Sequence, residues 1–184
     1  MNNTRRLGPV AQIAYVVPDL QDAIQHWVHT LGIGPWFLIP HIQYDELEFE
    51  GRPTRADISI ALANTGELQI ELIEQHNDEP SVYQPFRHHT GNGMHHTAIL
   101  TSSPEEDERR LVAAGMRRLQ RGLSTTGVET IFLAGGNVFP GMFELIRLTA
   151  PIAGAFQWLR ECAATWDGRT ETVQFAPPPP PTAK

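Results

Sequence analysis

The same order of predicted elements occurs twice along the chain, and this repeat constrains the fold more than any other feature. The run "QIAYVV" precedes a helical pattern at residues 20–31, and "HHTAILT" precedes a second helical pattern at 104–114. Short strands follow each helix, and both sets include the letters "ELI", at 71–73 and 144–146. A repeated βαβββ unit predicts two similar modules that share one core.

Capping residues mark where the two predicted helices begin and end. Asp19 is a typical N-cap and Gly32 a typical stop for the first helix. Ser103 and Pro104 start the second helix, and Gly115 ends it. Between the helices, "IQYDELEFEG" reads as a strand with an exposed face, and "ADISIALANTGELQIELIEQ" as two strands joined by a tight turn.

We therefore expect one domain of the α+β class over residues 1–184. Two paired βαβββ modules would form a curved mixed sheet, shaped as a cup with helices outside, and a C-terminal helix would follow. The expected divisions are a first module at 7–79, a polar linker at 80–92, a second module at 93–149, a C-terminal helix and extension at 150–175, and a Pro-rich tail at 176–184.

Composition narrows the class of partner. Fourteen basic and 21 acidic residues give a net charge of −7, which disfavours nucleic acid and anionic membranes as partners. No apolar run approaches the roughly 18 residues of a membrane helix. The opening "MNNTRRLGPV" lacks the apolar segment of a secretory signal, and the single cysteine, Cys162, cannot form an internal disulfide. We expect a cytoplasmic protein.

Two adjacent histidines begin the first strand of the second module. Regular alternation along a strand would point His95 and His96 to opposite faces of the sheet. His96 occupies the place in the repeat that Gln12 has in the first module, so we assign His96 to the inner face. His95 is then expected to face the helix layer.

Four strand positions become equivalent in pairs when the modules are superposed: Gln12 with His96, and Glu71 with Glu144. Taken singly, either glutamate could equally form a salt bridge or face solvent. Together, two carboxylates, an imidazole and an amide oxygen would meet at the centre of the sheet. This donor set suits a divalent cation, because oxygen-rich sites favour hard divalent ions.

The sequence resembles the vicinal-oxygen-chelate superfamily, the group of glyoxalase I, methylmalonyl-CoA epimerase, extradiol dioxygenases and bleomycin-resistance proteins. The opening "QIAYVVPDLQDAIQHWVHTLGIGPW" resembles the first strand and helix of that superfamily, and "LQIELIE", "GMHHTAIL" and "MFELI" resemble its other ligand strands. The resemblance covers about residues 8–149 and is strongest to the epimerase and glyoxalase I-like branch. It implies one divalent metal (Co, Mn, Ni, Mg or Zn) held by Gln12, Glu71, His96 and Glu144.

The resemblance also implies a reaction. Relatives bind two neighbouring substrate oxygens to the metal and stabilise an enolate, which predicts an isomerase, epimerase or lyase acting by proton transfer next to a carbonyl. Glu144 would serve as ligand and base, and Glu50 would be the second acid or base of an epimerase. A small-molecule substrate and a homodimer are expected.

Two alternatives stay open. One is a metal-free protein that binds a small molecule, as some relatives do. The other is a ring-cleaving dioxygenase, which the single histidine of the ligand set disfavours, because non-haem Fe(II) oxygenases use two histidines and one carboxylate.

Overall fold

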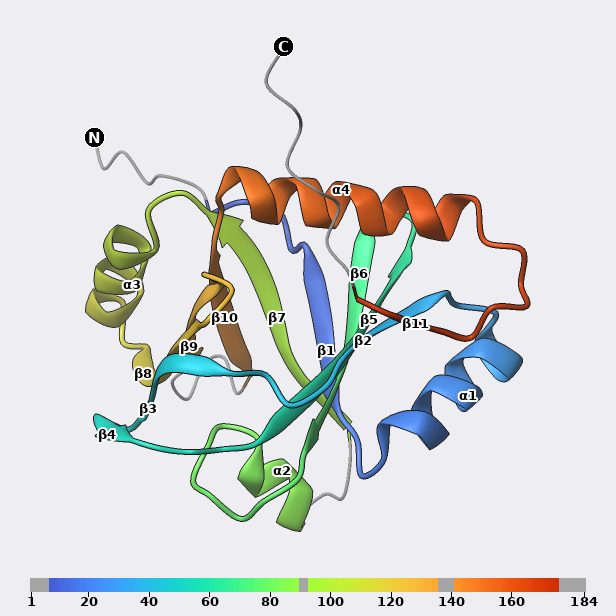
Figure 1. The fold of residues 1–184 in the computed structure, drawn as a ribbon. Helices are drawn as coiled ribbons and strands as arrows, with labels where there is room; N and C mark the ends of the chain where they lie inside the picture. Colours follow the sequence, from blue (N-terminus) through green and yellow to red (C-terminus); the bar gives the residue numbers. More distant parts are fainter. Residues whose placement is uncertain (1–6, 90–92, 136–140, 176–184) are drawn as a thin grey trace.

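The fold is one open, curved sheet with helices packed against it (Figure 1). The computed structural model describes residues 7–89, 93–135 and 141–175. The Pro-rich tail predicted at 176–184 lies outside these residues. Within the described residues, the sheet has eleven strands in the order β11-β2-β5-β6-β1-β7-β10-β9-β8-β3-β4.

Both predicted βαβββ modules are present, and each supplies four adjacent strands of the sheet. The first module contains β1 (Gln12–Val16), α1 (Leu20–Leu31), β2 (Trp36–Ile39), β5 (Ile58–Thr65) and β6 (Leu68–Gln75). The second contains β7 (Gly93–Thr101), α3 (Pro104–Ala113), β8 (Arg117–Ser124), β9 (Glu129–Ala134) and β10 (Met142–Arg147).

The first strands of the two modules lie side by side at the centre of the sheet. β1 pairs with β7 in antiparallel orientation, while each of them pairs in parallel with the last strand of its own module, β6 or β10. The α+β class and the curved mixed sheet are therefore confirmed. The central four strands, β6-β1-β7-β10, are the ones that carry the predicted ligands.

Helix α1 covers the outer face of the first module. The Asp19 carboxylate accepts a hydrogen bond from the backbone N–H of Asp22, and Gly32 ends the helix with a left-handed φ of 66°, both as predicted. An apolar face at helical spacing packs on the sheet. The buried residues of this contact are Leu20, Ile24, Val28, Trp36, Ala61, Ala63, Ile70 and Leu72.

Helix α3 covers the outer face of the second module in the same way, and Figure 1 shows it on the opposite side of the molecule from α1. It begins at Pro104 as predicted, although the Ser103 side chain makes no capping hydrogen bond. The buried residues beneath it are Ile99, Ile131, Leu133 and Leu145, with Leu111 of the helix packed against them.

A hairpin between β2 and β5 crosses from the first module to the second. Its strands are β3 (Tyr44–Phe49) and β4 (Arg52–Pro53), and β3 pairs with β8 rather than with a strand of its own module. Gly122 of β8 faces this hairpin closely, because a Cβ there would lie 3.2 Å from Leu47 and 3.3 Å from Tyr44. The β3–β8 pairing is therefore a second contact between the two modules, in addition to the β1–β7 pairing.

The described part of the predicted linker, residues 80–89, contains buried groups. It contains the short helix α2 (Gln84–His89), and the side chains of Ser81, Val82 and Tyr83 are buried. The Gln75 amide donates to the backbone carbonyl of Glu79 and accepts from the Ser81 hydroxyl at 2.6 Å. These bonds fix the path of the chain between the modules.

The C-terminal helix packs on the inner face of the first half, not outside it. α4 (Ala150–Ala164) begins at the Thr149 cap, and Leu159 is buried against Phe37 and Leu62. Leu62 is the register partner of Glu71, so α4 lies on the ligand side of the sheet. Strand β11 (Thr172–Gln174) then adds to β2 at the edge. None of the described helices is both long and apolar enough to cross a membrane.

Substitution by alanine should have opposite effects on stability at two glycines, Gly154 and Gly32. Gly154 lies in the interior of α4 with nothing near its Cβ position, so Gly154→Ala should stabilise the fold by roughly 0.5–1 kcal/mol. Gly32→Ala meets no neighbour either, but its φ of 66° should make the change destabilising by about 1 kcal/mol. Urea denaturation measures both, and equal effects would contradict this assignment of the helix ends.

Candidate metal centre

Three ionisable side chains meet on the inner face at the middle of the sheet. Glu71 comes from β6, His96 from β7 and Glu144 from β10, and one ligand atom from each lies within 4.8 Å of the others. His96 Nε2 is 3.1 Å from the Glu144 carboxylate and 3.6 Å from the Glu71 carboxylate. All three residues are buried.

Gln12 completes the set from β1. Its side-chain nitrogen donates to Gln69 Oε1 at 2.8 Å, which leaves its own oxygen without a hydrogen-bond partner among the described residues. A buried amide oxygen without a partner costs free energy, and a bound cation would satisfy it. The residues present therefore fit a divalent cation held by Gln12, Glu71, His96 and Glu144.

Two alanines make room for this cluster. Ala14 is the register partner of both Glu71 and His96, and Ala98 is the partner of both Gln12 and Glu144. Both alanines are fully buried. Because paired residues share a face of the sheet, the four longer side chains surround two small ones and can reach a common point.

Burial determines the electrostatics of the cluster. It raises the pKa of Glu144 to about 8 and, together with the charge of Glu144, raises the pKa of Glu71 well above its usual range. Burial also lowers the pKa of His96 to about 3. Two carboxylates that face each other in a dry site need protons or a cation, and a divalent ion satisfies both at once.

The prediction that His95 faces the helix layer is wrong. The register between β1 and β7 shifts at this point, so that Ala14 pairs with His96 while the next residue, Tyr15, pairs with Met94. His95 is the extra residue of a β-bulge, and a bulge breaks the alternation of side chains. His95 is therefore buried on the inner side, where its Nδ1 lies 2.8 Å from Nδ1 of His96.

The structure does not bring Glu50 to the cluster. Glu50 lies at the turn between β3 and β4, with a positive φ of 49°. Its side chain is half exposed and makes a 2.7 Å ion pair with Arg117 of β8. The catalytic role predicted for Glu50 thus has no support from its position.

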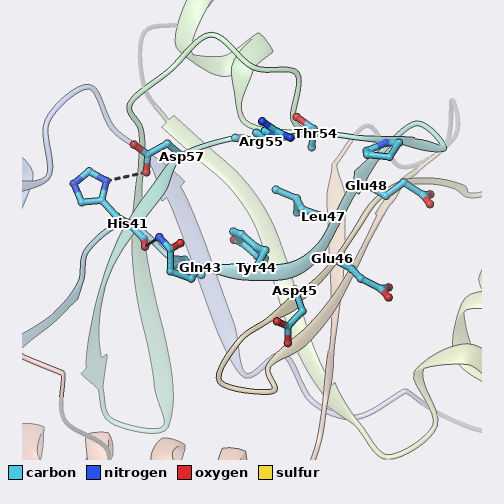
Figure 2. Close-up of a pocket in the computed structure, with 13 residues that line it drawn as sticks. His41, Gln43, Tyr44, Asp45, Glu46, Leu47, Glu48, Thr54, Arg55 and Asp57 are labelled. Atoms are coloured by element: carbon cyan, nitrogen blue, oxygen red, sulfur yellow. Dashed lines mark hydrogen bonds and ion pairs between the residues drawn. The ribbon is translucent and has the colours of Figure 1, made fainter.

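A cavity of about 830 Å³ lies between β3 and the segment that follows β4 (Figure 2). It is lined by His41–Glu48 and Pro53–Asp57. Figure 2 shows Leu47 pointing toward the segment with Thr54, while Asp45 and Glu46 point away from it. Leu47 packs against the buried inner-face cluster that includes Ala14, so the cavity adjoins the face that carries the ligands.

Tyr44 connects this cavity to the candidate metal centre. It lines the cavity, and burial and the charges of Glu71 and Glu144 raise its pKa above the usual range. Tyr44 is one of several aromatic residues in the sequence, and nothing local marks it as a site residue. The polar run around it gave no indication that its strand would cross to the second module.

A protein-family model matches about two thirds of the chain, including three of the four predicted ligands. The model of the Glyoxalase/Bleomycin resistance protein/Dioxygenase superfamily matches residues 11–132. The chain belongs to this superfamily. The match includes Gln12, Glu71 and His96, and it confirms the resemblance predicted from the sequence. A search of curated proteins finds no significant match.

Solved structures share the fold at low sequence identity. Methylmalonyl-CoA epimerase from Mycobacterium tuberculosis is 20% identical with a TM-score of 0.57, over 84% of this chain and 97% of that one. A hypothetical protein from Bacillus halodurans C-125 is 21% identical with a TM-score of 0.58, over 77% and 94%. A variant of Streptomyces coelicolor methylmalonyl-CoA epimerase in complex with 2-nitronate-propionyl-CoA is 19% identical with a TM-score of 0.55, over 79% and 100%.

The buried carboxylates predict how pH affects the metal-free protein. The folded state keeps a proton on Glu144 up to about pH 8, whereas the unfolded chain loses it near 4.5. Raising the pH within this window therefore favours the unfolded state. Titration of His96 does not offset this loss of stability above about pH 6.5, because His96 is mainly neutral there in both the folded and the unfolded state.

In the presence of a chelator, we expect the free energy of unfolding to fall between about pH 6.5 and pH 8. Urea denaturation at the two pH values measures it. Glu144→Gln removes one titrating group and should reduce the fall, whereas the exposed Glu67→Gln should not. Greater stability at the higher pH in the unsubstituted protein would contradict the burial that raises the pKa of these carboxyl groups.

Proposed function

We propose that this protein is a divalent-metal-dependent isomerase or epimerase that moves a proton on a carbon next to a carbonyl of a small-molecule substrate. The observation that supports it is the convergence of Glu71, His96 and Glu144, together with the buried, unpartnered oxygen of Gln12 on the strand between β6 and β7. A cavity large enough for a small molecule adjoins this face.

The donor set favours a redox-silent cation. Three oxygen ligands and one imidazole suit Mg²⁺, Mn²⁺, Co²⁺, Ni²⁺ or Zn²⁺, and a site with one histidine lacks the two that Fe(II) oxygenases use. A bound cation would act as a Lewis acid, stabilising the negative charge that develops when the substrate loses its proton.

Glu144 is the side chain that we assign to proton transfer. Its carboxyl lies at the cluster, and its raised pKa of about 8 shows that the site makes the charged form costly and the carboxylate strongly basic. His96 Nε2, 3.1 Å away, orients that carboxyl. Tyr44, whose pKa is raised by burial, stays protonated and can donate a hydrogen bond to a substrate oxygen.

A single proton-transfer group suffices for isomerisation, but epimerisation needs a second group on the opposite face of the carbon. Glu50, the sequence-based choice, is ion-paired with Arg117 at the hairpin turn. Tyr44 lines the cavity beside the ligand face, and burial together with the charges of Glu71 and Glu144 raises its pKa. Tyr44, which stays protonated, is therefore the candidate proton donor if the reaction is an epimerisation.

The alternative class is a protein that binds a small molecule without metal. Such a protein would have no use for two buried carboxylates, because burial raises the pKa of both and the charge of Glu144 raises that of Glu71 further, which destabilises an empty pocket. Metal analysis of the purified protein separates the two classes. The expected homodimer stays a prediction that sedimentation velocity would test.

Glu144→Gln should separate the two roles of this residue. Its amide oxygen can still reach the cation, as Gln12 illustrates, but the basic carboxylate is gone. We expect metal to be retained at least in part, while exchange of the substrate α-proton with deuterated solvent slows by about 10²- to 10⁴-fold. The assay tests 2-substituted acyl-CoA thioesters and 2-oxoaldehyde hemithioacetals, and NMR measures the rate of proton exchange in each.

Glu67→Gln is the matched control, because Glu67 is exposed on the β5–β6 turn. Glu50→Gln tests the sequence-based prediction and should leave exchange near the unsubstituted rate. A Glu144→Gln protein that holds metal and exchanges at the unsubstituted rate would remove Glu144 from proton transfer. Consumption of dioxygen in step with substrate would replace the proposal with a dioxygenase.

A further inference from the structure

A chain of hydrogen bonds runs from the linker to the candidate metal centre through both adjacent histidines. The backbone carbonyl of Val82 lies 3.0 Å from Nε2 of His95. His95 Nδ1 then lies 2.8 Å from His96 Nδ1, and His96 Nε2 faces Glu144 and Glu71. Both histidines are almost fully buried, so solvent does not compete for these bonds.

The direction of each bond in this chain follows from its ends. A carbonyl oxygen only accepts, so His95 Nε2 must carry the proton that it donates to Val82. Burial of both rings favours their neutral forms, and a neutral His95 with its proton on Nε2 has a lone pair on Nδ1, which accepts from His96 Nδ1–H. This leaves the lone pair of His96 on Nε2, the nitrogen that faces the two carboxylates.

The same assignment is reached from the opposite end. A neutral imidazole binds a cation through a lone pair, and the other nitrogen carries the proton. If His96 binds through Nε2, its Nδ1–H needs an acceptor, and His95 is the one within reach among the described residues. The two arguments agree on one tautomer for each ring.

The linker holds the far end of this chain in place. The Val82 backbone N–H donates to the side-chain oxygen of Gln120 on β8, and Gln120 is buried. On the other side, the Ser81 hydroxyl accepts from the backbone N–H of Tyr83 and donates to Gln75. Rings of Tyr83 and Phe86 pack at 5.1 and 4.8 Å from the His95 ring.

The β-bulge is what makes the chain possible. In a regular strand His95 would point to the other face and could not reach the His96 ring. The register shift at Ala14/Tyr15 turns His95 to the inner side, beside the linker. A conformational irregularity beside a functional cluster is typical of bulges that redirect a side chain.

We propose that His95 is a positioning residue that fixes the tautomer and orientation of His96, with the Val82 carbonyl as its anchor, so that Nε2 of His96 is presented to a divalent cation. This inference rests on the proposed metal centre. It predicts that the linker and the bulge, rather than the ligands alone, set the affinity for the cation, since partners behind a ligand typically contribute 10- to 100-fold.

The test compares His95→Leu with His95→Asn. Leucine fills the space without an acceptor, and we expect it to weaken Co²⁺ binding by about 10- to 100-fold in competition with a chelator. Asparagine places its side-chain oxygen near the position of ring Nδ1, so His95→Asn should recover much of that loss. His26→Leu, on the exposed face of α1, is the matched control and should bind Co²⁺ as the unsubstituted protein does.

Nitrogen-15 NMR of the unsubstituted protein gives a second readout that needs no variant to fold. We expect the proton of His96 on Nδ1 and that of His95 on Nε2, both without metal and with Zn²⁺. A His96 proton on Nε2 in the Zn²⁺-loaded protein, or equal Co²⁺ affinity in His95→Leu, would overturn the inference. An unsubstituted protein that binds no divalent cation would instead overturn the metal centre, while the metal-free tautomers would still decide the role of His95.

Discussion

Two carboxylates face one another at the centre of a buried sheet, and the rest of the site is arranged around that unfavourable contact. Burial alone raises the pKa of Glu144 to about 8, and the mutual repulsion adds to the shift of Glu71. Such a pair persists in a folded protein when something compensates for it. The imidazole of His96 and the unpartnered oxygen of Gln12 point to the same compensation, a cation between the four groups.

The sequence predicted the parts of this arrangement that depend on regular periodicity. The internal repeat gave the two modules. Superposing the modules then made Gln12 equivalent to His96 and Glu71 equivalent to Glu144. These predictions hold because burial of one apolar face fixes the register of each strand, so that a residue's position in the sequence determines the face on which it lies.

The remaining features depend on contacts between distant residues, which local patterns do not encode. The bulge at His95 adds one residue to β7, and a single extra residue is invisible to an alternation count. The crossing of β3 to β8 and the inner position of α4 follow from tertiary packing. The resemblance implies a catalytic role for Glu50, but the hairpin directs its side chain to Arg117 instead.

The most direct measurement of the central claim is anomalous X-ray scattering from crystals of the protein loaded with Co²⁺. The account predicts a single strong anomalous peak per chain, within bonding distance of the side-chain oxygens of Gln12, Glu71 and Glu144 and of Nε2 of His96. A peak bound through His95, or a Co²⁺-soaked crystal with no peak between these four residues, would contradict it.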